Sequence, residues 1–271
     1  MRVFAATLRK LVRRPATWVT LGLAIGLLSL ILLLVGATLQ EVPPGASRSA
    51  SLLFVTFPGA YVIVLSFVLG LGGLFAVIYG AAIAGSEWGW GTLKSAVARG
   101  ESRWHYIAAT FAAVALLLGL GLVIAYAAGI LSAILAGRLA GVAATGLDDP
   151  RILGELPDHL ARSWLAIAEQ GAVGFAVATL ARSQLAGIGV GVGLYFAEQF
   201  ADLFLPDIVQ YLPFHVANAA VNLGGLATGG APGAIGAGAM SPDQALWLTV
   251  AWLGGAVVVA CIATDRAEIS G

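Results

Sequence analysis

Long apolar stretches that contain almost no charge recur along this chain of 271 residues. The most continuous one covers residues 15–37 and has no Asp, Glu, Lys or Arg. A helix needs about 20 such residues to cross a lipid bilayer. Only 10% of all residues are charged, against about a quarter in an ordinary soluble domain, so one buried core cannot absorb this much apolar surface. The pattern therefore predicts an all-α membrane protein.

Six transmembrane helices are predicted within a single transmembrane domain, residues 1–271. They cover about residues 15–37, 58–84, 106–136, 164–181, 184–205 and 245–263, with a long outer loop at about 137–163. Residues 206–226 are interrupted by Pro206 and Pro213, which favours two short re-entrant helices on the outer side before the last span. A flexible glycine-rich loop is expected at 224–238. A count of seven or more spans is the alternative, and it would place the C-terminus outside.

Residues 1–14 carry five cations and no acid. Their apolar side chains fall roughly on one helical face, which predicts an interfacial amphipathic helix on an anionic leaflet. With six spans both termini share one side of the membrane, and that side holds ten of the fourteen Lys and Arg residues. Because cytoplasmic segments are enriched in these residues, both termini are predicted to be cytoplasmic, in the plasma or inner membrane of a cell.

Residues 85–104 join the second and third predicted spans on the cytoplasmic side. Within this segment, residues 91–99 alternate small, apolar and basic types, which indicates a short amphipathic helix. A helix attached at both ends to spanning helices would move both of them when a cytoplasmic partner pushes it. Glu87 is expected where the second span meets water, and tryptophans flank the segment, as they do at membrane interfaces. An ordinary solvated loop with interfacial anchors explains this pattern equally well.

The same segment resembles the cytoplasmic signature of ABC-2 type transporter permeases, the membrane-spanning subunits of ABC transporters. The matching run is Gly85-Ser86-Glu87, Gly91-Thr92-Leu93-Lys94, Arg99-Gly100 and Ser102-Arg103. The basic helix before the first span, the Leu-Pro-bearing short helices and the Asp265-Arg266 tail are similar as well. Thr110 departs from the family pattern, which often has a lysine at the start of the third span.

The resemblance implies a permease dimer, of identical or different chains, in which each half docks a separate cytoplasmic ABC ATPase. It implies that the ATPase-coupling residues are Glu87, Gly91, Thr92, Lys94, Arg99 and Arg103. It also implies that the first, second and fifth spans line the dimer and the transport path. ATP and Mg²⁺ would be bound by the partner ATPase, and this chain would need no cofactor.

No enzyme motif is recognisable in the chain itself. Lys94 is the one lysine followed by Ser or Thr, and Leu93 stands where a phosphate-binding loop requires glycine. The single cysteine, Cys261, and three scattered histidines give no metal-ligand spacing. The zero net charge gives no reason to expect a nucleic-acid partner. We therefore expect a transport subunit and not an enzyme.

Two acids, Glu169 and Glu198, fall inside predicted spans, about 10 Å below the outer end of each at 1.5 Å per residue. A charge at that depth faces protein or water rather than lipid. The two acids either line the substrate path or accept hydrogen bonds from neighbouring helices. The fifth span also carries G-x-x-x-G twice between Gly187 and Gly193, which predicts close helix contact, either at a dimer seam or within one subunit.

The resulting expectation is a permease subunit of an ABC transporter, an exporter that moves its substrate with ATP hydrolysed by a separate subunit. An ATP-independent channel or secondary transporter, with Glu169 and Glu198 as ion-coupling groups, is the second hypothesis. A membrane-complex scaffold without transport activity is the third. The apolar spans are compatible with a lipid, a peptide or a hydrophobic drug, and the sequence singles out none of them.

Overall fold

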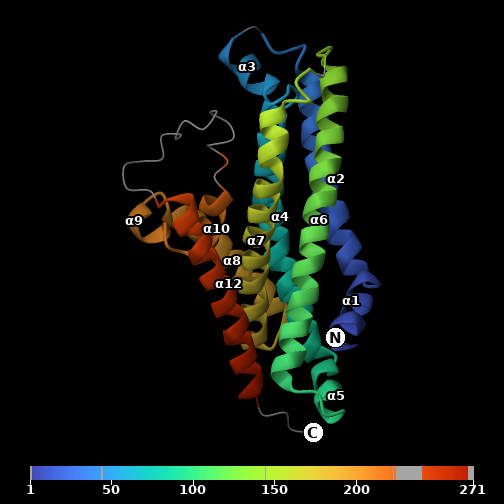
Figure 1. The fold of residues 1–271 in the computed structure, drawn as a ribbon, viewed down its shortest axis with the longest axis vertical. Coiled ribbons are helices and arrows are strands. Elements are labelled where there is room, and N and C mark those ends of the chain that lie inside the picture. Colours follow the sequence, from blue (N-terminus) through green and yellow to red (C-terminus); the bar gives the residue numbers. More distant parts are fainter. Residues whose placement is uncertain (1, 44, 144, 222, 224–239, 268–271) are drawn as a thin grey trace.

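The computed structural model of the chain describes every residue except 1, 44, 144, 222, 224–239 and 268–271. Throughout the described part, helices are joined by turns and no strand is present (Figure 1). The long helices are α2 (Pro15–Thr38), α4 (Gly59–Gly89), α6 (Arg103–Leu139), α7 (Pro150–Ala181), α8 (Gln184–Ala201) and α12 (Pro242–Asp265). The short helices are α1 (Arg2–Val12), α3 (Ala46–Leu52), α5 (Thr92–Ala98), α9 (Pro206–Val209) and α10 (Pro213–Val221).

Five of the long helices, α2, α4, α6, α7 and α12, are long and apolar enough to cross a membrane. The prediction of an all-α, multi-pass membrane protein is therefore confirmed. α8, which corresponds to the fifth of the six predicted spans, has only 18 residues and includes the polar pair Glu198 and Gln199. It packs beside α4 and α7. Because the six long helices alternate in direction, α1 and the C-terminal end of α12 both lie in the lower part of Figure 1.

The expected outer loop at about residues 137–163 is wrong for most of its length, because α7 begins at Pro150. The Asp149 side chain accepts a hydrogen bond from the Arg151 backbone nitrogen and so caps the helix. The first turns of α7 are amphipathic, and Ile152 is buried in the main core cluster. Charged residues on the other face lower the local hydropathy, which is why hydropathy placed residues 150–163 in a loop and not in a helix.

The segment before the last span contains two short helices, α9 and α10, as the two prolines predicted. Each begins at one of them, Pro206 or Pro213, where a missing backbone N–H costs nothing. α10 packs against α7 and α12. The predicted glycine-rich loop at 224–238 lies outside the described residues. Helix α3 was not predicted, and it lies in the connection between α2 and α4.

Small residues let the long helices approach one another closely. A side chain at Gly80 of α4 would overlap the backbone of Gly171 on α7. A side chain at Gly36 of α2 would likewise overlap the backbone of Ala136 on α6. Close approach increases van der Waals contact, which replaces the hydrophobic effect as the main source of helix association within lipid.

The two overlapping G-x-x-x-G motifs of α8 lie on opposite faces of that helix. Gly187 packs against Ala178 of α7, and Gly191 packs against Val77 of α4. The glycines of the second motif, Gly189 and Gly193, face open space. The first motif therefore serves packing within the chain, whereas the second is on the outer surface.

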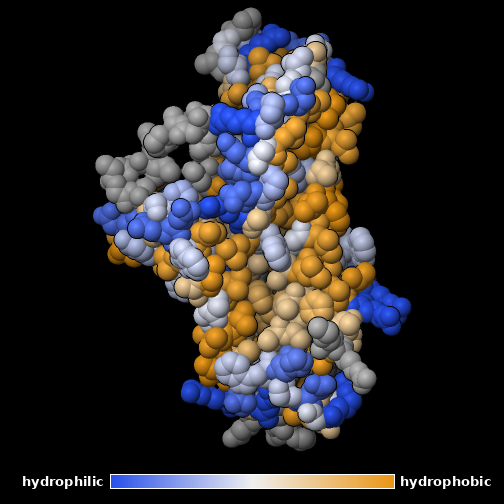
Figure 2. Space-filling model, in the orientation of Figure 1, coloured by the Kyte–Doolittle hydropathy of each residue, from blue (hydrophilic) through white to orange (hydrophobic). Residues whose placement is uncertain are grey.

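The surface of the molecule separates into an apolar band and two polar ends. Figure 2 shows the orange apolar surface running obliquely from the lower left to the upper right, over α12 at one side and over α2 and α6 at the other. Blue polar surface lies at the upper left, at the lower end and at the lower right edge. A bilayer covering the orange band leaves α1 and α5 at one polar boundary.

Candidate coupling site around Glu87

The predicted short helix within residues 91–99 is confirmed by α5, which connects α4 to α6. Gly91 precedes it with φ +64°, a left-handed conformation that favours glycine. Leu93 and Ala96 are buried against the bundle, whereas Lys94 and Arg99 are exposed. α5 is therefore amphipathic, with its apolar side held by the bundle and its basic side facing outward.

Glu87 lies in the last turn of α4 and is only 1% exposed. Lys10 Nζ is 2.5 Å from its Oε1 oxygen, and Arg14 Nη2 is 3.5 Å from the same oxygen. The hydroxyls of Thr92 and Tyr106 each donate to its Oε2 oxygen at 2.5 Å. One carboxylate therefore connects α4 with α1, with the turn after α1, with α5 and with α6.

Two further contacts strengthen the junction between the basic N-terminal segment and the end of α4. Arg14 Nη1 donates to the Ser86 hydroxyl at 2.7 Å. The Arg14 guanidinium also stacks over the Trp90 ring, 4.6 Å from its centroid, in a cation–π contact. Sequence reasoning placed Glu87 at the water boundary, but α1 covers it.

The residues of the family-like motif have different structural roles. Glu87 and Thr92 are in direct contact, and Gly91 makes the turn between their helices. Gly85 allows α4 to contact α8, because a side chain there would overlap the backbone of Gln184. Gly91 and Thr92 therefore belong to the Glu87 junction, whereas Gly85 serves the contact between α4 and α8.

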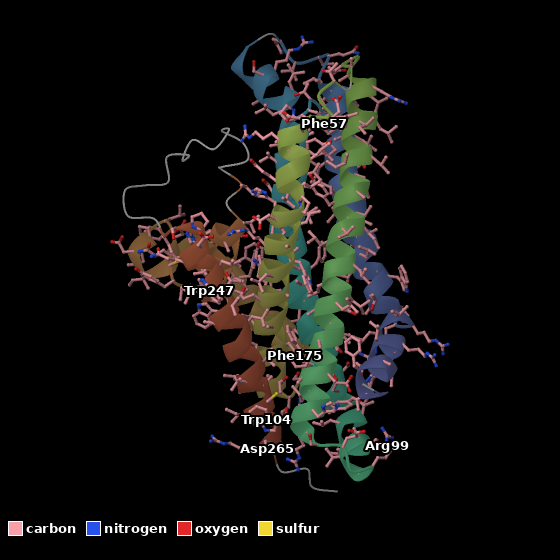
Figure 3. All side chains as sticks on the ribbon, in the orientation of Figure 1. Phe57, Arg99, Trp104, Phe175, Trp247 and Asp265 are labelled. Atoms are coloured by element: carbon pink, nitrogen blue, oxygen red, sulfur yellow. The ribbon has the colours of Figure 1, made fainter. Side chains whose placement is uncertain are left out.

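Arg103 is not part of this junction. Its Nη1 nitrogen donates to the carbonyl oxygens of Thr264, Asp265 and Ala267, which close the C-terminal end of α12. A cation at this position also complements the negative end of the helix dipole. Figure 3 shows Arg99, directly after α5, and Asp265, at the end of α12, in the lower part of the molecule.

A polar cleft of about 540 Å³ opens beside the junction, between α1, α5 and the start of α6. Its lining includes Thr7 and Lys10 of α1, Ser95 of α5, and the exposed Arg99 and Glu101. These groups offer both signs of charge and several hydroxyls. The cleft can therefore receive a polar side chain of another protein.

The two acids that were predicted to lie inside spans, Glu169 and Glu198, differ in their surroundings. Glu198 of α8 accepts a hydrogen bond from the backbone nitrogen of His215 and so caps the first turn of α10. Glu169 of α7 is fully buried, and neither of its oxygens has a hydrogen-bond partner among the described residues. The same is true of the neighbouring Gln170 side chain. No group of three or more metal-ligating side chains occurs in the described part of the chain.

Comparisons with known protein families and with curated proteins gave no match. The chemistry of the site must therefore be argued from its own residues. Both oxygens of the Glu87 carboxylate are paired, and these contacts join α4 with α1, the turn after α1, α5 and α6.

Proposed function

We propose that this chain is the permease subunit of an ABC transporter of the ABC-2 type, an exporter driven by a separate ATPase. The observation that carries the proposal is the Glu87 junction beneath α5. α5 has an exposed basic side, and its buried side is connected to α1, α4 and α6 through Glu87, Thr92 and Tyr106. Such a helix would carry the motion of a cytoplasmic partner into the membrane.

The junction would transmit motion because its parts cannot move independently. Displacing α5 alone would break the Thr92–Glu87 contact and expose a charge that is paired inside the protein. A hydrogen bond to a charged group contributes about 1.5–3 kcal/mol. A push on α5 would therefore move α4, α6 and the interfacial helix α1 together rather than separate them.

The proposed second permease subunit, an identical or a related chain, would contact the outward faces of α2 and α8. Gly189 and Gly193 of α8 face open space, and so do Gly22 and Gly26 of α2. Small residues four apart are typical of helix pairs in membranes. This supports a dimer in which the path lies between the two subunits.

The proposal is tested by reversing one exposed charge of α5. In mild detergent the wild-type protein should co-purify with an ATP-hydrolysing subunit. Arg99→Glu should weaken that association at least tenfold, because like charges at an interface repel and 1.4 kcal/mol corresponds to about tenfold. Arg138→Glu is the matched control, since Arg138 is exposed near the opposite end of α6. Equal recovery of the ATPase with all three proteins would contradict the proposal.

One observation favours the second hypothesis, an ATP-independent transporter. Glu169 is a buried acid without a partner among the described residues, and such acids often bind protons or ions in transporters. In that case the purified protein in liposomes would give gradient-driven flux without ATP, and Glu169→Gln would abolish it. Flux that requires ATP and is blocked by vanadate would support the ABC proposal instead. A scaffold would show neither.

A further inference from the structure

An apolar groove of about 310 Å³ opens between α2, α4 and α6. Its floor is formed by small residues, including Ala24 of α2, Gly72 and Ala76 of α4, and Gly121 of α6. The groove exists because α2 is in close contact with α6 at Gly36, toward its C-terminal end, whereas its first turns are largely exposed. It lies in the membrane-spanning part of the subunit and extends to the turn between α1 and α2.

The polar groups at this end of the groove already have partners. Thr17 Oγ1 donates to the Leu11 carbonyl oxygen at 2.8 Å and lies 2.9 Å from the Tyr79 hydroxyl. The Trp18 indole donates to the carbonyl oxygen of Val12 at 2.8 Å. The groove therefore offers a ligand apolar side chains and almost no free hydrogen-bonding group. This chemistry suits a hydrocarbon chain.

The cations of α1 and the turn after it are divided between two faces. Lys10 and Arg14 turn inward to the buried carboxylate of the coupling site. Arg9 and Arg13, each one residue earlier, are exposed, and neither has an acidic partner within the described part of the chain. Val12, next to Arg13, lines the groove. Two guanidinium groups are therefore left at the membrane surface beside an apolar groove.

We propose that the groove binds an acyl chain of one anionic phospholipid from the leaflet on the α1 side, with its phosphate against Arg9 and Arg13. Guanidinium groups bind phosphate with paired, charge-assisted hydrogen bonds. Basic segments at a membrane surface also attract anionic lipids. The apolar lining accepts the chain and the two arginines select the headgroup. The site is independent of the proposed ATPase partner, because it uses neither α5 nor Glu87.

The test compares binding of phosphatidylglycerol and phosphatidylcholine with identical acyl chains to the full-length protein, by native mass spectrometry. The wild type should prefer phosphatidylglycerol by about thirtyfold, from about 1 kcal/mol for each arginine. The double variant Arg9→Gln/Arg13→Gln should bind both lipids equally. The matched control Arg138→Gln/Arg151→Gln removes two exposed cations at the other end of the molecule and should keep the preference.

A second variant separates groove binding from attachment to the helix surface. Gly121→Phe fills the groove, where the nearest atom to an added Cβ is Leu21 Cδ1 at 3.7 Å. It should lower binding of both lipids. Gly255→Phe on α12 is its control, because Gly255 faces open space and does not line the groove. Equal binding by these two variants, or equal affinity of the wild type for both lipids, would overturn the proposal.

A third measurement uses the wild-type protein and so does not depend on a variant that folds. Phosphatidylglycerol with a photoreactive acyl chain should label peptides of α2, α4 and α6 that line the groove. Labelling spread evenly over all lipid-exposed helices would mean annular lipid only and would overturn the proposal. Labelling that is absent from the groove because a second copy of the chain covers it would overturn it too.

Discussion

Two buried glutamates of this protein have opposite surroundings. Glu87, at the end of α4, has both oxygens paired with side chains from other segments of the chain. Glu169, within α7, is equally buried, yet neither oxygen has a described partner. A carboxylate whose oxygens are all paired within the protein holds segments in place. A carboxylate whose oxygens have no protein partner can still bind a proton or an ion. Burial alone therefore does not distinguish a structural acid from a functional one.

The largest expected effect comes from Glu87→Ala, which leaves Lys10 and Arg14 facing a gap inside the protein. We expect a loss of about 3–5 kcal/mol in the free energy of unfolding, because one partner of a buried ion pair is removed. Denaturant unfolding in detergent measures this loss. Glu101→Ala, an exposed acid after α5, is the control and should change stability by less than about 0.5 kcal/mol. Equal stability of both variants would show that the junction is not a stabilising contact.

Tyr106→Phe sharpens the comparison by deleting a single bond to Glu87 and leaving the ion pair intact. A hydrogen bond to a charged group contributes about 1.5–3 kcal/mol, so the variant should lose that much stability. Tyr211→Phe, at an exposed tyrosine, is the matched control. The comparison would fail if the Tyr106 variant were as stable as its control in the same unfolding assay.

Glu169→Leu is expected to stabilise the protein, whereas Glu87→Ala is expected to destabilise it. Burying a polar group without a hydrogen bond costs about 1–3 kcal/mol, so removing it should raise the free energy of unfolding by about that amount. Thermal unfolding in detergent measures the change. A loss of stability instead would mean that Glu169 has a partner, such as a bound ion or water, and would end its contrast with Glu87.

Glu198→Ala should have the smallest effect, because Glu198 only caps the first turn of α10, where it accepts a hydrogen bond from the His215 backbone nitrogen. Loss of a helix cap typically costs about 1 kcal/mol. Glu198→Gln keeps an acceptor oxygen and should recover most of the loss. If Glu198→Ala lowered the free energy of unfolding as much as Glu87→Ala does, Glu198 would hold segments together as Glu87 does, and not merely cap a helix.

The predicted bounds match a helix closely where that helix is apolar all round, and they fall short of it where the helix is amphipathic. Residues 15–37 match α2 closely because lipid-facing and protein-facing sides are both apolar there. The first turns of α7 carry charges on one side, and hydropathy assigned them to a loop. α8 ends at Ala201 and not at 205, because capping by later residues, and not hydropathy, sets where a helix stops.

The site was half predictable. The acid Glu87, the turn at Gly91 and the short helix after it follow from local residue types. Their partners do not, because Lys10 is 77 positions from Glu87 in the chain and Tyr106 is 19 positions away. Arg103 was grouped with the coupling residues by its position in the motif; it begins α6, and its side chain donates to carbonyl oxygens at the C-terminal end of α12, a contact that the sequence did not predict.

The sequence by itself determined that this chain enters a membrane as several helices, because long uncharged segments cannot be accommodated in water. It also determined where those helices are interrupted by glycine, proline and charge. Only the tertiary structure decided which acid is satisfied and which is not, and where an apolar groove lies beside exposed arginines. The physical reason is that hydropathy is a property of one segment, whereas pairing and cavities depend on groups that folding brings together from distant segments.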